Sequence, residues 1–354
     1  MSRLELAIIF PVALAGGCAV DHDAAVGAET ATVKRTRYAI TEIPVESASD
    51  RSQASRAVCA HRAAVGYATS NTSGTEHAIL FDARGITRLP TLGGRFSRGY
   101  AATADGAIVG ESSTAGFRSH AFVFRDGVMT DLGTLGGAFS SAWGINADGD
   151  IVGQATLITG GDVPSHATLW TGGQAIDLGT LGGAESFARD INNDGVIVGA
   201  ASAAVEEFRA HAVVWRDGVI EALPANGALH GVAAAINNAG TIAGSVVYVA
   251  GQPWHAVVWR DGVMTDLGNF GSSAFALGLD ESGDVVGMAW DASGSRPHAF
   301  LYTKHDELLD LETLVDNGAG WQLLQAVDVC NDGRIVGNGN LFGANRGFVL
   351  TPVR

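Results

Sequence analysis

The sequence predicts an all-β fold, a seven-bladed β-propeller formed by one domain over residues 38–354. Three observations predict it. A unit of 43 to 46 residues recurs along the chain, each copy divides into four short extended segments, and the two ends of the array are incomplete in complementary ways. The composition agrees, because 48 glycines and 8 prolines in 354 residues are typical of a chain that turns often between short strands.

Three landmarks define the repeat. A Val-Gly or Ala-Gly pair is followed by a His-Ala dipeptide and then by an Asp-Leu-Gly element, which is clearest at residues 131–137 and 177–183. The His-Ala dipeptide begins at His77, His120, His166, His211, His255 and His298, and a degenerate seventh copy reads Arg346-Gly347-Phe348. This fixed order of landmarks indicates a repeat architecture in place of a chance similarity.

Each copy contains four predicted strands. The first ends in Ile-Asn, as at Ile145-Asn146, and a turn with glycine leads to the second, which carries the Val-Gly pair. The third begins at His-Ala and ends at a dipeptide such as Asp217-Gly218, which favours a hairpin because both central residues need positive φ. The fourth is the Asp-Leu-Gly element. We interpret the asparagine as a structural residue whose side chain satisfies the turn.

The ends of the array favour a ring over a straight β-solenoid. The array opens with a lone strand of the fourth type at residues 38–44 and finishes on a strand of the third type at residues 348–353. A ring lets the first of these complete the last sheet, whereas an open stack would leave both edges exposed.

The three motifs resemble a known repeat family. His-Ala-Phe/Val-x-Trp, Asp-Leu-Gly-Thr-Leu-Gly-Gly and Ile-Asn-x-x-Gly-x-Ile-Val-Gly are similar to the HAF repeats of bacterial exported proteins, over residues 38–353 and best over 120–200. The resemblance implies an extracellular or cell-envelope location. It implies no established activity.

The N-terminus is interpreted as an export signal. Arg3 precedes an apolar run at residues 6–15, which is too short to span a bilayer and ends in small residues. Residues 1–17 then form a signal peptide, and the segment resembles a bacterial lipoprotein signal in which Cys18 carries the lipid. An ordinary signal cut after Ala15 is the alternative. Residues 18–37 are expected to form a lipid-anchored or flexible linker, so the membrane is contacted through the anchor alone.

Charge and motif content narrow the partners. The net charge of −15, with two lysines in the chain, argues against a nucleic-acid partner. No phosphate loop, nucleophile elbow or zinc helix is present, and we expect neither cofactor nor metal. Residues 146–150 and 280–284 space oxygens as calcium loops do, but they lack the distal glutamate and are interpreted as turns. We expect a monomer.

Two repeated columns are interpreted as structural. The histidines lie at one register on successive blades and therefore diverge, so a hydrogen bond between strands or blades suits them better than a metal site. The aromatic residues four positions later are expected to fill the space between blades. Their members are Phe81, Phe124, Trp170, Trp215, Trp259 and Tyr302.

The candidate ligand residues lie in the first strand, whose small side chains at a period of two place it nearest the axis. One position between them varies among copies, and variation is where a repeat scaffold can encode specificity. The binding candidates are Arg56, Tyr100, Trp143 and Arg189, a set suited to an anionic or sugar ligand, with packing between blades as the alternative.

Two carboxylates break the pattern of small residues beside this column. Asp190 and Asp328 stand where other copies carry alanine or glycine. A carboxylate near a narrow channel is solvated, paired or functional, so these two residues are the catalytic candidates.

Cys59 and Cys330 are the disulfide candidates. The sequence aligns both with the asparagine position, in the first and last copies, which a ring would bring together. An exported protein permits such a bond. Two buried thiols are the alternative.

Three classes of function are compatible with these residues. The first is a non-catalytic envelope propeller that binds a protein or glycan partner. The second is a propeller enzyme, a lyase or hydrolase, that uses the two aspartates with nearby arginines. The third is a structural protein that spaces other components. The fold does not choose among them, because propellers host all three.

Overall fold

The computed structural model describes residues 36–45, 47, 50–58, 63–70, 73–116, 118–158, 164–203, 210–269, 271–305 and 307–353, and of residues 55–58 the backbone alone. The predicted signal peptide and Cys18 lie outside the described residues, as does Cys59. Over the described ranges the secondary structure is β-strand apart from one 3-10 helix, η2 (Leu311–Leu314). No helix there is long and apolar enough to cross a membrane.

Four antiparallel strands form each repeating unit, and they are consecutive in the chain in every unit but the last. Within the described residues these units give five four-stranded sheets and one eight-stranded sheet, in which the parallel pair Glu76↔Phe96 joins two units. The eight-stranded sheet contains β2 (Arg51–Val58), β3 (Ala63–Thr69), β4 (Glu76–Asp82), β5 (Gly85–Arg88), β6 (Gly93–Ala102), β7 (Ile108–Thr114), β8 (Ser119–Arg125) and β9 (Val128–Gly133).

The next three sheets follow in chain order. They are formed by β10 (Gly136–Ile145), β11 (Ile151–Leu157), β12 (Ser165–Thr171) and β13 (Gln174–Asp177), then by β14 (Gly182–Ile191), β15 (Ile197–Ala203), β16 (Ala210–Arg216) and β17 (Val219–Ala222), and then by β18 (His230–Ile236), β19 (Ile242–Val247), β20 (His255–Arg260) and β21 (Val263–Gly268).

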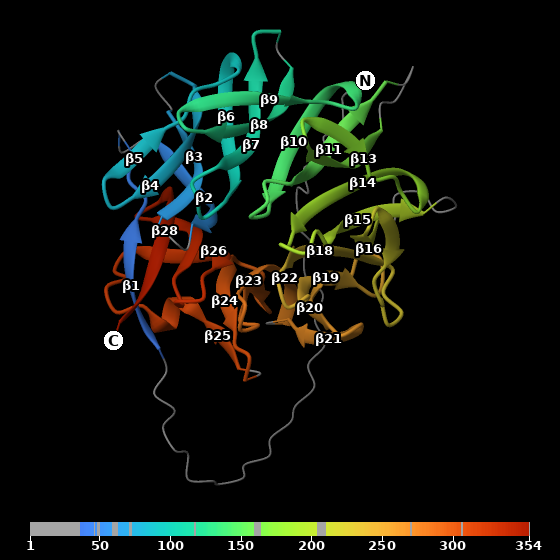
Figure 1. Cartoon of the computed structure of the whole chain (residues 1–354). Coiled ribbons are helices and arrows are strands. Elements are labelled where there is room, and N and C mark those ends of the chain that lie inside the picture. Colours follow the sequence, from blue (N-terminus) through green and yellow to red (C-terminus); the bar gives the residue numbers. More distant parts are fainter. Residues whose placement is uncertain are drawn as a thin grey trace.

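The last two sheets are formed by β22 (Gly271–Leu279), β23 (Val285–Asp291), β24 (Pro297–Tyr302) and β25 (Leu308–Asp310), and by β26 (Trp321–Val329), β27 (Ile335–Leu341), β28 (Ala344–Val353) and β1 (Arg37–Glu42). Each unit packs against the next, and β2 packs against β26, β27 and β28. The order of contacts is therefore circular, and Figure 1 shows the units around a common centre.

The N-terminal strand completes the last sheet. β1 pairs antiparallel with β28, from Arg37↔Val353 to Glu42↔Phe348. The other edge of β1 is covered as well, because the Ile40 amide donates to Asn317 Oδ1 at 2.8 Å and the Asn317 amide donates back to the Ile40 carbonyl at 3.2 Å. The predicted pairing of the two ends of the array is confirmed, as Figure 1 shows where β1 lies beside β28.

The predicted hairpin turns are also confirmed. Asp126, Asp217 and Asp261 have φ near +50°, and the glycine after each is also at positive φ. Both central residues of each turn therefore have the left-handed conformation that a tight hairpin of this kind requires.

The repeated histidine forms the predicted hydrogen bond between strands. In four copies its Nδ1 faces the aspartate of the Asp-Leu-Gly element on the fourth strand of the same unit. The pairs are His120–Asp131 at 2.8 Å, His166–Asp177 at 2.9 Å, His255–Asp266 at 2.8 Å and His298–Asp310 at 3.1 Å. The same carboxylate accepts a backbone N–H two residues on, as Asp177 does from Gly179 at 2.8 Å, so one side chain holds both the histidine and the turn.

The repeated asparagine links neighbouring units in addition to its predicted turn role. Asn192 Oδ1 accepts the amides of Asp194 and Val196 at 3.1 and 2.9 Å, which is the turn role. Its Nδ2 donates to the Asn237 carbonyl of the next unit at 3.2 Å. Asn146 and Asn237 repeat the second contact with the Asn192 and Asp280 carbonyls at 3.2 and 3.0 Å. The result is a ladder of hydrogen bonds from unit to unit.

The aromatic column packs in the core, as predicted. Trp215 and Trp259 are 1% and 2% exposed. Their Nε1 atoms donate to the carbonyls of Leu178 and Pro224 in the preceding unit, at 2.9 and 2.7 Å. The apolar clusters contain residues of adjacent sheets, so the core lies between the sheets.

Candidate functional site

A β-bulge in the first strand of every unit positions the candidate ligand residues. The pairing with the second strand shifts by one residue at the same column, for example between Ala142 and Gly144. The residues inside the bulges are Ser55, Tyr100, Trp143, Arg189, Ala234, Leu277 and Val327. Bulges change the direction of side chains relative to the sheet, so this column presents its side chains in a common way.

This bulge explains why each copy of the repeat carries the glycine of the Val-Gly landmark. The glycine of the second strand lies opposite the residue before the bulge, and a Cβ atom at Gly153 would overlap the Ser141 carbonyl oxygen. Gly199 has the same relation to Phe187, and Gly110 to Arg98. Only glycine fits there, so the repeat carries a glycine wherever it carries a bulge.

Arg189 and Trp143 stack on each other across two adjacent sheets. The Arg189 Cζ atom lies 4.4 Å from the centroid of the Trp143 ring and 4.9 Å from that of Phe187. The two rings meet edge to face, with centroids 6.0 Å apart. Among the residues that the structure describes, no carboxylate forms an ion pair with this guanidinium. The site therefore holds a cation that is balanced by aromatic faces alone.

Tyr100 belongs to a polar network on the neighbouring unit. Its hydroxyl donates to Glu111 Oε1 at 2.8 Å, and Arg98 Nη1 donates to the same oxygen at 3.0 Å. Arg98 also pairs with Glu76, while Ser119 donates to Glu111 Oε2 at 3.3 Å. The two carboxylates hold Arg98 in place, in contrast to Arg189.

The pKa values of Arg189 and Tyr100 are both shifted, and burial is the largest cause of each shift. Burial lowers the pKa of the Arg189 guanidinium to about 10, and the nearby Tyr100 opposes that shift only in part. Burial, followed by the Glu111 carboxylate, raises the pKa of Tyr100 well above its usual range. At neutral pH the site therefore contains a charged guanidinium and a protonated phenol that can donate one hydrogen bond and accept another.

The strand register moves Arg56 out of the predicted column. Ala54 pairs with Gly66 and Arg56 with Val65, so Ser55 occupies the bulge and Arg56 shares the next position with Asp190 and Asp328. The sequence alignment misplaced this copy by one residue. The side chain of Arg56 lies outside the described residues. The structure thus brings together three of the four predicted binding residues, Tyr100, Trp143 and Arg189.

Asp190 and Asp328 lie between units. Asp190 is 1% exposed, and its Oδ2 accepts the Ile236 backbone amide of the next unit at 3.0 Å. Asp328 is 6% exposed and packs on Gly278 of the preceding unit, as Asp190 packs on Gly144. The small residues in this column are needed because a neighbouring backbone lies against them. This geometry favours a structural role for both carboxylates.

Cys330 is disulfide-bonded, is 1% exposed and packs with Ala54 and Ala64 of the first unit. The chain's other cysteines, Cys18 and Cys59, lie outside the described residues. The register places Val58, and not Cys59, at the position equivalent to Asn146, so Cys59 follows one residue later than the sequence alignment gave.

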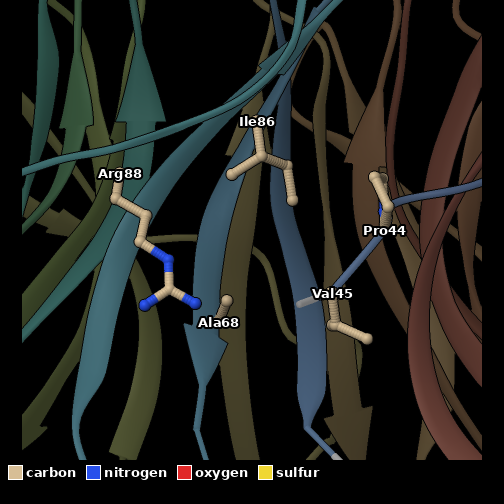
Figure 2. A pocket seen from close by; sticks show the side chains of 5 residues that line it. All are labelled: Pro44, Val45, Ala68, Ile86 and Arg88. Atoms are coloured by element: carbon tan, nitrogen blue, oxygen red, sulfur yellow. The ribbon is translucent and has the colours of Figure 1, made fainter. Parts of the chain in front are cut away.

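A separate cavity of about 210 Å³ lies where the first and last units meet. Pro44, Val45, Ala68, Ile86 and Arg88 line it, and Figure 2 shows Arg88 across the cavity from Pro44 and Val45. None of the candidate residues lines it.

The described residues contain no group of three or more His, Cys, Asp or Glu side chains arranged to hold a metal. In the segment 146–150 the Asn146 side chain accepts backbone amides, and Asp280 does the same in 280–284. Both segments are turns, as predicted.

Sequence reasoning missed Phe187, Arg98 and Glu111. Phe187 and Arg98 stand two residues before the bulge, outside the variable column. Glu111 follows the Val-Gly glycine, where other copies carry neutral residues, so a charge unique to one copy was a signal that could have been used.

Comparison with known proteins identifies the fold. Oligogalacturonate lyase in complex with manganese superposes with a TM-score of 0.55 at 10% identity, over 89% of this chain and 93% of that one. The β-propeller domain of the Trilobed protease from Pyrococcus furiosus, which has an open velcro topology, gives 0.53 at 12% identity over 70% and 80%. A puromycin-hydrolyzing peptidase from Mycobacterium tuberculosis gives 0.52 at 13% identity over 86% and 50%.

No family model and no curated protein matches the sequence. At these identities the structural likeness concerns the fold alone. The chain has a β-propeller fold, and its function has to be argued from its own residues.

Proposed function

We propose that this chain is an exported seven-bladed β-propeller that acts as a non-catalytic binding module for a glycan or protein ligand. The observation that carries the proposal is the Arg189 guanidinium, stacked on Trp143 and Phe187 with no carboxylate partner among the described residues. A half-buried cation without a counter-ion costs stability, and such a cost is commonly accepted where a ligand supplies the missing charge.

The blade count follows from treating the eight-stranded sheet as two units. One residue pair joins β4 to β6, whereas within each half the strands pair along their length. Two such units together with the five four-stranded sheets give seven blades, in agreement with seven copies of the repeat. The pairing of β1 with β28 supports closure of the ring.

Export rests on residues 1–17, and anchoring rests on Cys18 as a lipid attachment site. The HAF-like motifs support the same location, the cell envelope or the extracellular space. Residues 18–37 would separate a monomeric propeller from the membrane. Mass spectrometry of the mature N-terminus tests this part: a lipidated Cys18 is expected, and an unmodified chain that begins at Gly16 contradicts the anchor.

The binding test compares Arg189 with an arginine that is already neutralised. Arg84 is exposed and pairs with Asp82 at 2.6 Å, so Arg84→Met removes one positive charge without touching the site. We expect the full mature chain to bind acidic members of a glycan array, and we expect Arg189→Met to lower the signal at least tenfold while Arg84→Met leaves it unchanged. Equal signals from both variants, or binding confined to neutral glycans, would refute the site.

The alternative is a propeller lyase or hydrolase that uses Asp190 and Asp328. It is less well supported, because the Asp190 carboxylate already accepts a backbone amide of the next unit. Its test is turnover of an acidic polysaccharide by the wild-type chain and by Asp190→Ala and Asp328→Ala. Turnover that both variants lose would establish the alternative.

A further inference from the structure

We infer that the site takes a sugar acid of monosaccharide size, a hexuronate, in which one ring carries a carboxylate and several hydroxyls. The inference rests on the proposed binding function and names its ligand class. It comes from two chemically different groups of side chains on three consecutive units. Arg189 forms the first wall, Tyr100 with Glu111 forms the second wall, and Trp143 lies on the unit between them.

The first wall recognises one negative charge. The Arg189 Cζ atom lies over the Trp143 and Phe187 rings, at 4.4 and 4.9 Å from their centroids, and its N–H groups form no hydrogen bond with a described residue. Those N–H groups lie in the guanidinium plane and form the fork that binds a carboxylate with two hydrogen bonds. Contact with two rings that are nearly perpendicular to each other restricts the position of the guanidinium before a ligand arrives.

The second wall recognises hydroxyl groups. Tyr100 donates to Glu111, which leaves the lone pairs of the phenol oxygen to accept a hydrogen bond. Arg98, whose side chain is 38% exposed, keeps N–H donors beyond those used for Glu76 and Glu111. Donors and acceptors close together are what a ring of sugar hydroxyls requires.

The surface between the walls is aromatic. Trp143 and Phe187 meet edge to face, and Trp143 is half-buried. A pyranose ring has an apolar C–H face that packs on such rings, whereas a simple carboxylate offers nothing to cover them. The aromatic surface therefore favours a sugar acid over a small aliphatic acid.

The charge of the site selects a monoanion. Arg98 and Arg189 carry two positive charges and Glu76 and Glu111 carry two negative charges, but both carboxylates pair with Arg98 and neither pairs with Arg189. A phosphorylated sugar would bring close to two charges near those carboxylates and meet repulsion, while a carboxylate brings one charge to the one guanidinium without a partner. The hexuronate fits this balance.

The experiment measures dissociation constants of the full mature chain by calorimetry for D-glucuronate, D-glucose, acetate and glucose 6-phosphate. D-glucuronate is expected to bind at least tenfold more tightly than each of the others. A uronic-acid oligomer forms a further arm: equal affinity per site for monomer and oligomer identifies a terminal or free residue, and a gain with length identifies a polymer that extends beyond the site.

Three variants separate the two walls. Arg189→Met should reduce D-glucuronate affinity at least tenfold, to the level of D-glucose, and Arg84→Met should not change it. Tyr100→Phe should reduce D-glucuronate affinity about three- to tenfold while leaving acetate binding unchanged, since only the hydroxyl wall is altered.

The outcomes distinguish the ligand class from the function. If acetate and D-glucuronate bind equally and both depend on Arg189, the hexuronate inference is wrong while anion binding stands. If glucose 6-phosphate binds most tightly, the charge argument is wrong. If no anion depends on Arg189, the proposed function fails together with the inference.

Discussion

Arg189 and Trp143 occupy the same bulge position on neighbouring sheets, and the guanidinium of one stacks 4.4 Å above the ring of the other. A repeat normally places identical side chains at equivalent positions. The bulge position instead differs among the units, and on these two neighbouring units it holds side chains whose chemistry is complementary. That place is where we locate the ligand.

Arg189→Met should stabilise the protein. The variant keeps the apolar stem and removes a desolvated charge that has no carboxylate partner among the described residues, so we expect the free energy of unfolding to rise by about 1 kcal/mol. Urea denaturation of the ligand-free chain measures it. Arg84→Met serves as the control and should change stability by less than about 0.5 kcal/mol. A destabilised Arg189→Met variant would mean that the cation has a structural partner.

Asn192→Ala should destabilise the protein by about 2 to 3 kcal/mol, because one side chain satisfies two turn amides and one carbonyl of the next unit. Asn192→Asp keeps the acceptor and loses the donor, so it isolates the contact between units. Asp194→Ala, an exposed change in the same turn, should be nearly neutral. Equal losses in all three would assign the effect to the turn conformation and not to the ladder.

Ala222→Asp should stabilise the protein by adding a fifth histidine–aspartate pair, in one of the units that lack it. Ala222 pairs with Val213 in the register that Asp177 and Thr168 have in another unit, so the new carboxylate would face His211. We expect a gain of about 0.5 kcal/mol, small because Pro224 offers no amide to the carboxylate. Thermal denaturation checks it against Ala222→Asn. No gain over Asn would show that the histidine contributes only by packing.

Alkaline pH should loosen the closing strand. Burial, followed by the nearby Asp284 carboxylate, raises the pKa of Tyr38 to about 12, above the ordinary value of 10 in an unfolded chain. Below pH 10 both states hold the proton, so the contribution is complete. Between pH 10 and 12 the unfolded state loses the proton first and stability falls, by about 2 to 3 kcal/mol for this group.

Denaturation at pH 8 and pH 11 measures about half of this loss, roughly 1.4 kcal/mol. Tyr38→Phe should show a smaller decrease between the two pH values than the wild type. Tyr248→Phe is the comparison, because Tyr248 lies outside the closing strand while its pKa is also raised, by burial and then by the Asp266 carboxylate. Identical decreases in wild type and Tyr38→Phe would contradict the assignment.

Reduction should destabilise the ring at the junction of the first and last units. Cys330 is disulfide-bonded, and Cys59 is the partner that the sequence predicts. A bond between them closes a loop of about 270 residues, which is worth at most about 5 kcal/mol in the chain-entropy model. Peptide mapping without reductant should recover a 59–330 link. Cys59→Ser and Cys330→Ser should lower the melting temperature equally and Cys18→Ser should not; a link from Cys330 to Cys18 would refute the pairing.

The sequence was sufficient for the strands and turns because their causes are local. Asp217-Gly218 forms a hairpin through its own φ preferences, and Val213 to Trp215 are buried through their own hydrophobicity. The pairing of β1 with β28 was also predictable, since it follows from the strand types at the two ends of the array.

The site was predictable only in part. Tyr100, Trp143 and Arg189 were found because they differ among copies at one column. Arg56 was misplaced by one residue because the bulge is a feature of backbone pairing that composition does not reveal. Glu111 and Phe187 were missed because they reach the site from positions outside the bulge column. The packing of the sheets decides which side chains converge there.

The pairing of Arg37 with Val353 has a consequence for how the molecule is made. β1 pairs with β28, so this sheet cannot form until the segment that forms β28 has been synthesised. Closing so long a span costs entropy that grows with the logarithm of chain length, and non-local pairing of this kind makes folding slow. Such a delay would suit the export proposed above, because the last sheet stays open while the chain crosses the membrane.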